Sequence, residues 1–256
     1  MNITTTLKKV YNNLSFDEAS HTYTHKNKKL IPVSNIVHTF IKEFDTEGIS
    51  ERFALKHNKN QNSVKKEWAD GAKQACDFGT KVHNFGEKYA TLRYFKQGNH
   101  NSLIPSSGQE KAVIKYWNEL PKHIIPVVLE LQMYSVTFGY AGTADILLYN
   151  TTTKKFIIAD YKTNKDIFKN FANNTMLAPF DNMLDMPYNH YQLQLSLYQI
   201  LLEEQGYEVE ANVLIWLLPN GNYQQYKTKN FTNILKEQLQ NKLEKKEIIV
   251  LEGSGY

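Results

Sequence analysis

The spacing of apolar residues in the first part of the chain predicts a hairpin followed by helices. Residues 16–33 alternate aromatic or apolar positions with polar ones around an Asn-Lys-Lys turn, as two paired strands do. From Ser34, a predicted N-cap, apolar residues recur every three or four positions as far as Phe44, which predicts a helix. Residues 50–75 continue as charged helical sequence. Residues 72–95 form a further amphipathic helix.

Two features of these helices leave questions for the structure. The lysines and acids of residues 50–75 are typical of a solvated helical face, and a face turned towards a polyanion such as DNA is the alternative. Gly79 and Gly86 lie inside the next helix, where each costs about 1 kcal/mol relative to alanine. We therefore expect another backbone or a ligand to approach the helix closely there.

In the centre of the chain the apolar pattern becomes that of strands. We expect one α/β domain with the element order helices, three strands, helix, strand, helix. The predicted segments are strands at 127–136, 144–149 and 156–159, a turn at 150–153, an irregular stretch at 164–190, a helix at 191–205, a strand at 209–218 and a lysine-rich helix at 230–247.

Composition narrows the class of protein. Of the 256 residues, 41% are hydrophobic and 22% are charged, which is ordinary for a folded soluble protein, and the net charge of +4 permits a polyanionic partner without requiring one. Cys76 is the single cysteine, so an internal disulfide and a thiolate-held iron–sulfur cluster or zinc are excluded. The polar start predicts no secretory signal, and the longest apolar stretch, residues 213–218, is too short for a membrane span. We expect a cytoplasmic protein with no membrane partner.

Two aspartates stand at the margins of the predicted central hairpin. Asp145 ends the run Gly-Thr-Ala-Asp, and Asp160 follows fifteen residues later, so antiparallel pairing brings both to the same end of the hairpin. A carboxylate beside such apolar segments is costly unless it is paired or binds a metal ion. Two interpretations are open: a metal site, or a turn capped by Asp160 with Asp145 paired to Lys162.

Lys162 lies two residues after Asp160, so on a strand both side chains point to the same face. A lysine there can contact a phosphate and orient an attacking water, and unlike arginine it can give up a proton. The alternative is an exposed charge at the end of a strand.

Helix and strand positions outside the hairpin add further candidates. His83 and Glu87 are four residues apart and share one helix face, and Glu130 lies on the strand before the hairpin. One imidazole with two aspartates suits Mg²⁺ or Mn²⁺, of which Mn²⁺ tolerates nitrogen better. Structural roles on exposed positions are the alternative. Gln194 and Tyr198 are also four apart, and a glutamine in an apolar helix stripe indicates a hydrogen-bonding task or simply a surface position.

These motifs together resemble the PD-(D/E)XK nuclease core. Gly-x-x-Asp145 followed by Asp160-x-Lys162 resembles its metal hairpin, and His83 with Gln194-x-x-x-Tyr198 is similar to the extra motifs of the RecB-like branch. That branch includes helicase-associated nucleases, CRISPR-associated exonucleases, the mitochondrial genome maintenance exonuclease and many phage exonucleases.

The resemblance implies a fold and a set of roles. The fold would be a restriction-endonuclease-like α/β core, a central mixed sheet flanked by helices with a helical N-terminal elaboration. His83, Asp145, Asp160 and the Tyr161 carbonyl would bind the metal, and Lys162 would assist the attacking water. Glu87, Gln194 and Tyr198 would support the catalytic site. The single domain, residues 1–256, would comprise an N-terminal hairpin and helical part (1–70), a catalytic core (71–220) and a C-terminal helical extension (221–256).

The activity implied is a DNA exonuclease dependent on Mg²⁺ or Mn²⁺, acting on single strands or DNA ends in phage or bacterial recombination, repair or degradation. Members with an iron–sulfur cluster carry four cysteines, so this chain departs from that subgroup. It also has no helicase phosphate-binding loop, so a helicase or a single-strand annealing protein would be a partner. A structure- or sequence-specific endonuclease and an inactive nucleic-acid-binding or inhibitor module are the alternatives.

The irregular stretch 164–190 contains four aromatic residues that bear on this activity. We expect them either to stack on the bases of a bound strand or to form a packed flap. They are Phe168, Phe171, Phe180 and Tyr188.

Overall fold

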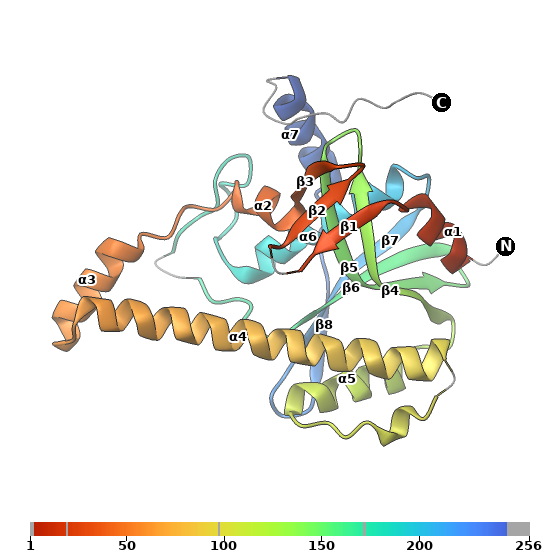
Figure 1. Cartoon of the computed structure of the whole chain (residues 1–256), viewed down its shortest axis with the longest axis horizontal. Coiled ribbons are helices and arrows are strands. Elements are labelled where there is room, and N and C mark those ends of the chain that lie inside the picture. Colours follow the sequence, from red (N-terminus) through yellow and green to blue (C-terminus); the bar gives the residue numbers. More distant parts are fainter. Residues whose placement is uncertain (1–2, 19, 97, 171–172, 245–256) are drawn as a thin grey trace.

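The structure, a computed structural model, describes residues 3–18, 20–96, 98–170 and 173–244. A π-helical turn (Thr91–Phe95) follows α4, and a 3-10 helix (His100–Ser102) precedes α5. In chain order the other elements are α1 (Ile3–Val10), β1 (Leu14–Asp17), β2 (Thr22–His25), β3 (Lys28–Pro32), α2 (Val33–His38), α3 (Thr46–His57), α4 (Gln61–Ala90), α5 (Gly108–Glu119), β4 (Ile124–Ser135), β5 (Tyr140–Asn150), β6 (Lys155–Lys162), α6 (Pro187–Glu203), β7 (Val209–Leu217), β8 (Tyr223–Lys227) and α7 (Thr232–Glu244) (Figure 1).

The fold is α/β, with a central mixed sheet of eight strands flanked by helices and a long helical region near the N-terminus, as predicted. The sheet order is β1-β2-β3-β5-β6-β7-β8, and β4 pairs with β5. The β3–β5 and β6–β7 pairs are parallel and the other pairs are antiparallel.

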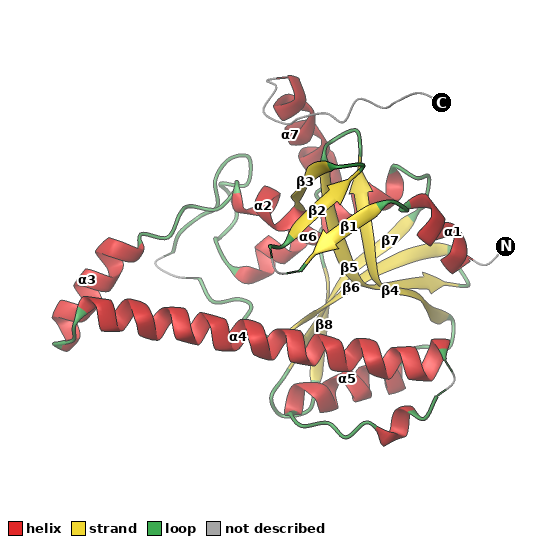
Figure 2. Cartoon of the chain, in the orientation of Figure 1, coloured by secondary structure: helices red, strands yellow, loops and turns green. Residues whose placement is uncertain are grey.

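Helices cover both faces of the sheet (Figure 2). Alternation along β5 and β6 supplies both cores: Leu147 and Ile158 pack with α6, α2 and α7, whereas Ile146 and Ala159 pack with α4 and α5. Strands buried on both faces read as nearly continuous apolar runs, which explains the sequence of the central hairpin. Among the described residues, no helix combines the length and the apolar character of a membrane span.

One edge of β5 is shared by two different strands. Tyr140 and Ala141 pair with β3, and residues 146–150 pair with β6, while β4 follows the opposite edge along nearly its whole length. Residues 142–145 therefore face a gap between β3 and β6. The Tyr198 ring of α6 packs directly over Gly142 beside this gap: a Cβ atom on Gly142 would lie 2.6 Å from the Tyr198 Cε1 atom. The glycine of the Gly-x-x-Asp motif thus makes room for a side chain from the covering helix.

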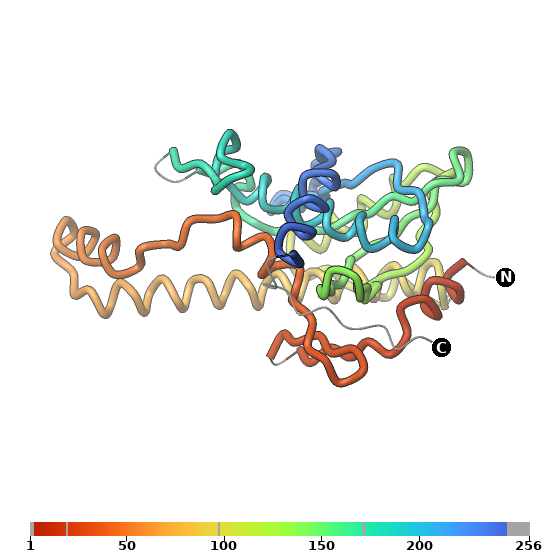
Figure 3. Tube along the Cα trace, turned by 90° about the horizontal axis from the view of Figure 1, so that it is seen from above, coloured from red at the N-terminus to blue at the C-terminus, as the bar shows by residue number. Residues whose placement is uncertain are grey.

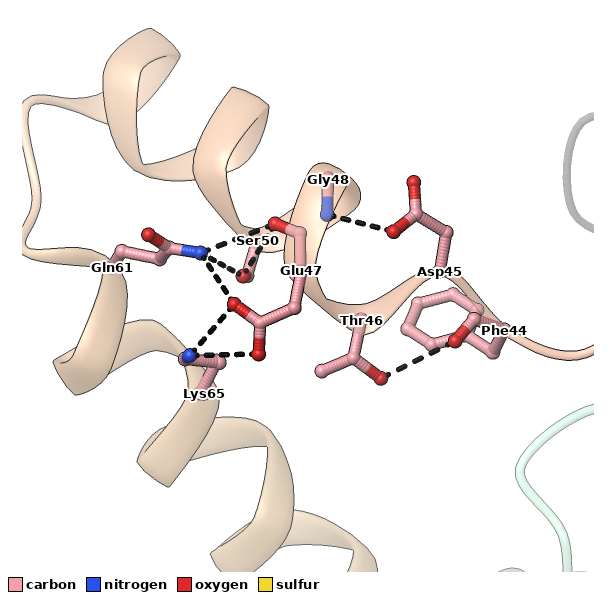
Figure 4. A network of polar contacts seen from close by, with 8 residues as sticks. All are labelled: Phe44, Asp45, Thr46, Glu47, Gly48, Ser50, Gln61 and Lys65. Atoms are coloured by element: carbon pink, nitrogen blue, oxygen red, sulfur yellow. Dashed lines mark hydrogen bonds and ion pairs between the residues drawn. The ribbon is translucent and has the colours of Figure 1, made fainter.

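α3 and the first half of α4 project from the rest of the molecule as an arm (Figures 1 and 3). The two helices are joined by polar contacts of Glu47, whose carboxylate accepts hydrogen bonds from Lys65 at 3.0 Å and from Gln61 at 3.2 Å (Figure 4). Asp45 caps α3 by accepting a bond from the Gly48 N–H. The predicted charged helical sequence is confirmed, and these charges form ion pairs within the arm.

Helix boundaries differ from the prediction at several places. The predicted N-cap, Ser34, is wrong: the helix begins at Val33 with Pro32 at its N-cap and ends at His38. The helix predicted at 191–205 spans Pro187–Glu203 instead. The predicted segments 50–75 and 72–95 are divided instead at residues 58–60, where Asn58 takes a left-handed conformation with φ 50°. One helix of 30 residues therefore crosses the boundary drawn at residue 70. The division of the chain into domains stays a prediction.

The C-terminal part contains one strand that the apolar pattern did not predict, β8. β8 pairs with β7 after an Asn-Gly turn, Asn220-Gly221, and this dipeptide followed by aromatic and polar residues is a hairpin signal. The predicted terminal helix is present as α7, and residues 245–247 of that prediction lie outside the described residues.

The predicted irregular stretch is confirmed between β6 and α6, where an isolated bridge joins Thr175 to Leu184. Its aromatic residues divide between the two alternatives. Phe180 is buried against Phe40, as in a packed flap, whereas Phe168 is 39% exposed. Phe171 lies outside the described residues.

Gly86 and Gly79 give a matched test of helix packing. A Cβ on Gly86 would lie 2.7 Å from Cε2 of the buried Tyr161 ring, so we expect Gly86→Ala to lower the free energy of unfolding by up to about 2 kcal/mol, the cost of overpacking less the gain in helix propensity. At Gly79 the nearest atom is 3.4 Å away, and Gly79→Ala should raise that free energy by up to about 1 kcal/mol. Urea unfolding of both variants measures the difference, and equal stability would contradict the close packing of Tyr161 on α4.

Candidate metal centre

A cleft of about 850 Å³ opens beside β5, at the gap between β3 and β6, and the predicted residues line it. α4 contributes from one face of the sheet and α6 from the other, and the strand ends lie between them. Seven of the eight predicted site residues, together with Glu130, line the cleft: His83 and Glu87 from α4, Glu130 from β4, Asp145 from β5, Asp160 and Lys162 from β6, and Gln194 and Tyr198 from α6.

Asp145 joins α4 to the strands. Its Oδ2 atom lies 3.0 Å from Nδ1 of His83 and accepts a hydrogen bond of 3.1 Å from the Tyr161 N–H. The register that pairs Ile146 with Ala159 sets Asp145 beside Asp160, as predicted from the hairpin. Asp145 therefore pairs with His83, and the alternative pairing with Lys162 is wrong because that lysine lies on Asp160.

Glu130 reaches the same group by an unusual backbone conformation. Its φ of 48° is left-handed in the middle of β4, a conformation that costs a non-glycine residue on the order of 1 kcal/mol or more. One ligand atom each from His83, Glu130 and Asp145 lies within 4.8 Å of the others. No hydrophobic pattern signals a left-handed residue inside a strand, so the sequence supported Glu130 only as a further candidate.

These three residues fit a hard divalent ion. Neighbouring ligands around an octahedral ion with bonds of about 2.1 Å are about 3 Å apart, which matches the separation of His83 and Asp145. Asp160 adds a buried carboxylate, and its Oδ2 atom is paired with Nζ of Lys162 at 2.6 Å. An imidazole with several carboxylates suits Mg²⁺ or Mn²⁺. His83, Glu130 and Asp145 thus form a group that could hold a metal ion.

Lys162 is held beside Asp160 rather than exposed at a strand end. Its Nζ atom lies 2.6 Å from Asp160 Oδ2, 4.2 Å from the centre of the Tyr191 ring and 3.4 Å from Oε1 of Gln194. The Gln194 amide in turn donates to the Tyr198 hydroxyl at 3.0 Å. Tyr191 and Gln194 of α6 therefore orient the lysine, and the interpretation of Gln194 as a plain surface residue is wrong.

The crowded carboxylates shift one another's pKa values. Burial, followed by the charge of Asp145, raises the pKa of Glu130 from 4.5 to about 8 and that of Asp160 from 3.8 to about 6. Burial would lower the pKa of His83, but the charge and hydrogen bond of Asp145 outweigh burial and raise this pKa to about 9. Burial also opposes the charge on Lys162, and Asp160 outweighs it, so the pKa of the lysine is raised. The lysine is therefore a cation.

Two predicted residues stand apart from the metal group. Glu87 lines the cleft but is exposed and lies outside the cluster of possible ligands. The Tyr161 side chain points to the face of the sheet opposite to those of its strand neighbours Asp160 and Lys162. There it is buried against α4 and meets the His83 ring edge-on at 5.8 Å. A metal bond to the Tyr161 carbonyl stays a prediction.

Comparison with models of known protein families finds none that matches the chain, and comparison with curated proteins likewise finds no match.

Replacing Glu130 tests the composition of the metal centre. We expect Glu130→Gln to weaken Mn²⁺ binding roughly tenfold or more, because even residues that only support metal ligands contribute about 10- to 100-fold. Glu87→Gln removes a carboxylate from the same cleft but outside the cluster, so it should change the affinity less than threefold. Calorimetric titration with Mn²⁺ measures both. A larger loss for Glu87→Gln than for Glu130→Gln would place the ion beside Glu87 and contradict the proposed cluster.

The raised pKa values predict a pH dependence of stability. Between pH 7 and 9 the folded, metal-free protein binds more protons at Glu130 and His83 than the unfolded chain does, so the free energy of unfolding should fall as the pH rises. Mn²⁺ should restore stability most at pH 9, because it replaces those protons. Urea unfolding in EDTA and in Mn²⁺ at pH 7, 8 and 9 measures this, and Glu130→Gln should flatten the fall between pH 7 and 8. A metal-free stability that rises with pH contradicts the prediction.

Proposed function

We propose that the protein is a metal-dependent deoxyribonuclease that hydrolyses phosphodiester bonds, and that it acts as an exonuclease. The observation that carries the proposal is the cleft that unites His83, Asp145, Asp160 and Lys162, with the lysine ammonium 2.6 Å from Asp160. Carboxylates that hold a divalent ion next to a cationic lysine are suited to a phosphate that must be bound, neutralised and attacked by water.

The roles of the residues follow from their contacts. His83, Glu130 and Asp145 would hold the ion, and the buried Asp160 carboxylate, paired with Lys162, lies next to them in the cleft. When bound, the ion supplies positive charge that neutralises the phosphate, and it lowers the pKa of a water molecule.

Lys162 provides a second positive charge, which Gln194 and Tyr191 hold in place. Because Asp160 keeps it protonated, its task is to bind the phosphate and orient the water rather than to remove a proton.

The cleft needs the ion for electrostatic reasons as well. The acidic residues along it outnumber the two cationic ones, Lys162 and the protonated His83: they are Glu18, Glu87, Glu130, Asp145 and Asp160. A polyanion entering this cleft would be repelled without a divalent cation, so metal dependence follows from the charge balance.

The resemblance to the PD-(D/E)XK nucleases supports the same reading. The resemblance implies an α/β fold with a central mixed sheet flanked by helices, which is the fold class of this chain, and its motif residues line one cleft. We accordingly propose membership of the RecB-like branch without an iron–sulfur cluster. DNA, and a helicase or single-strand annealing protein acting upstream, are the proposed partners, in the cytoplasm of a bacterial or phage-infected cell.

Metal-dependent digestion tests the proposal. The purified protein should degrade end-labelled linear DNA in Mg²⁺ or Mn²⁺ and release mononucleotides, and closed circles should resist. We expect Asp160→Asn and Lys162→Ala each to lower the rate by about 100-fold or more. Arg52→Ala, which removes an exposed charge on the arm far outside the cleft residues, should leave the rate unchanged.

Two outcomes would change the assignment. Cleavage of closed circles would show an endonuclease of the same fold. Digestion that continues in EDTA, or that survives Asp160→Asn, would refute the metal-dependent mechanism.

A further inference from the structure

Aromatic side chains of the N-terminal hairpin form one wall of the cleft. Phe16 of β1 stacks on Tyr23 of β2 with ring centres 4.5 Å apart and planes at 26°. His21 meets Phe16 edge-on at 5.2 Å and 87°. All three rings line the same cleft as Asp145 and Asp160, and we refer to them as the hairpin stack.

The hairpin stack is held in register with the metal centre. The Tyr23 hydroxyl is 2.9 Å from Oγ1 of Thr143, which lies two residues before Asp145 on β5. Tyr23 is 3% exposed and packs with Leu30 and Ala141, where β3 joins β5. The stack therefore keeps a constant position relative to the carboxylates.

Two members of the stack are left open to the cleft. Phe16 is only partly buried, and His21 is exposed at the turn into β2 with a left-handed φ of 48°. Rings that served packing alone would be covered by the core, as the Tyr23 ring is. Phe16 and His21 instead offer aromatic surface to whatever occupies the cleft.

The charge of the cleft decides what the stack can bind. With five acidic residues against one lysine and two histidines along its walls, phosphate contacts outside the metal centre add little affinity there. Stacking of a nucleobase on an aromatic ring contributes about 1 to 3 kcal/mol and does not depend on the charge of the wall. A base can stack on a protein ring only when its face is not covered by neighbouring bases of a duplex.

We propose that the hairpin stack binds an unpaired nucleobase of the strand whose phosphate lies at the metal centre, so that the substrate class is single-stranded nucleic acid or a frayed end. This inference rests on the proposed function and adds to it the residues that distinguish unpaired from paired strands. Phe16 and His21 would contact the base, and Tyr23 would position them.

An oligonucleotide binding series tests the stack. All binding is measured in a Lys162→Ala background, so that the oligonucleotide is not digested. In this background we expect the double variant Phe16→Ala, His21→Ala to bind a short single-stranded oligonucleotide in Mn²⁺ between about fivefold and about 150-fold more weakly than the protein with the stack intact, the range set by one stacked base. An oligonucleotide with one abasic position should show the same loss with the protein whose stack is intact and no further loss with the double variant. The fluorescence of 2-aminopurine at that position should be quenched only when the stack is intact.

Control variants separate the stack from other aromatic surfaces. Phe44→Ala removes a ring that is 58% exposed on the α2–α3 connection and outside the cleft, so it should not alter oligonucleotide binding. Phe168→Ala tests the irregular segment before α6, and a loss confined to this variant would assign stacking there and overturn the proposal. The melting temperature and Mn²⁺ affinity of the double variant verify that its fold and metal centre are intact.

The failures of the two proposals are distinguishable. Metal-dependent digestion of DNA with equal affinity for intact and abasic oligonucleotides would refute the hairpin stack and leave the nuclease standing. Absence of any metal-dependent digestion by the unchanged protein would refute the nuclease, and with it the role given to the stack.

Discussion

The Asp145 carboxylate is the interaction on which the candidate site depends. One of its oxygens takes the His83 ring from α4 and the backbone N–H of Tyr161 from β6, so a single atom joins the long helix to two strands. A buried carboxylate must be paired to be tolerated, and here the pairing is also what brings the imidazole to the strand ends. His83 could not be placed by its own helix, which is largely exposed in its first half.

The same crowding leaves the centre electrostatically unsatisfied. Burial, followed by the charge of Asp145, raises the pKa values of Glu130 and Asp160. Lys162 offsets part of this charge. Holding several buried acidic groups together with one lysine costs free energy. Strongly shifted pKa values of this kind are typical of functional sites, and a bound cation would offset the negative charge.

The arrangement around β5 explains why the site lies where it does. β3 and β6 share one edge of the strand and leave residues 142–145 between them, so side chains from α4, α6 and the N-terminal hairpin can all reach the opening. Because Gly142 has no side chain, the Tyr198 ring can pack directly over it beside this gap. The metal centre and the hairpin stack are thus two sides of a single break in the sheet.

Much of this protein was determined by local sequence. The nearly continuous apolar runs predict β5 and β6, and because the turn between them is short, antiparallel pairing brings Asp145 beside Asp160. The spacing of four places His83 with Glu87 and Gln194 with Tyr198 on their helices. The tertiary structure decided the rest, since it depends on contacts between distant segments. These contacts set the approach of α4 to the strands and exclude Glu87 from the metal cluster, and they support the left-handed Glu130 that brings a carboxylate into it. The hairpin stack likewise lies at the cleft only because β3 pairs with β5 more than a hundred residues away, and no local periodicity predicts a partner at that distance.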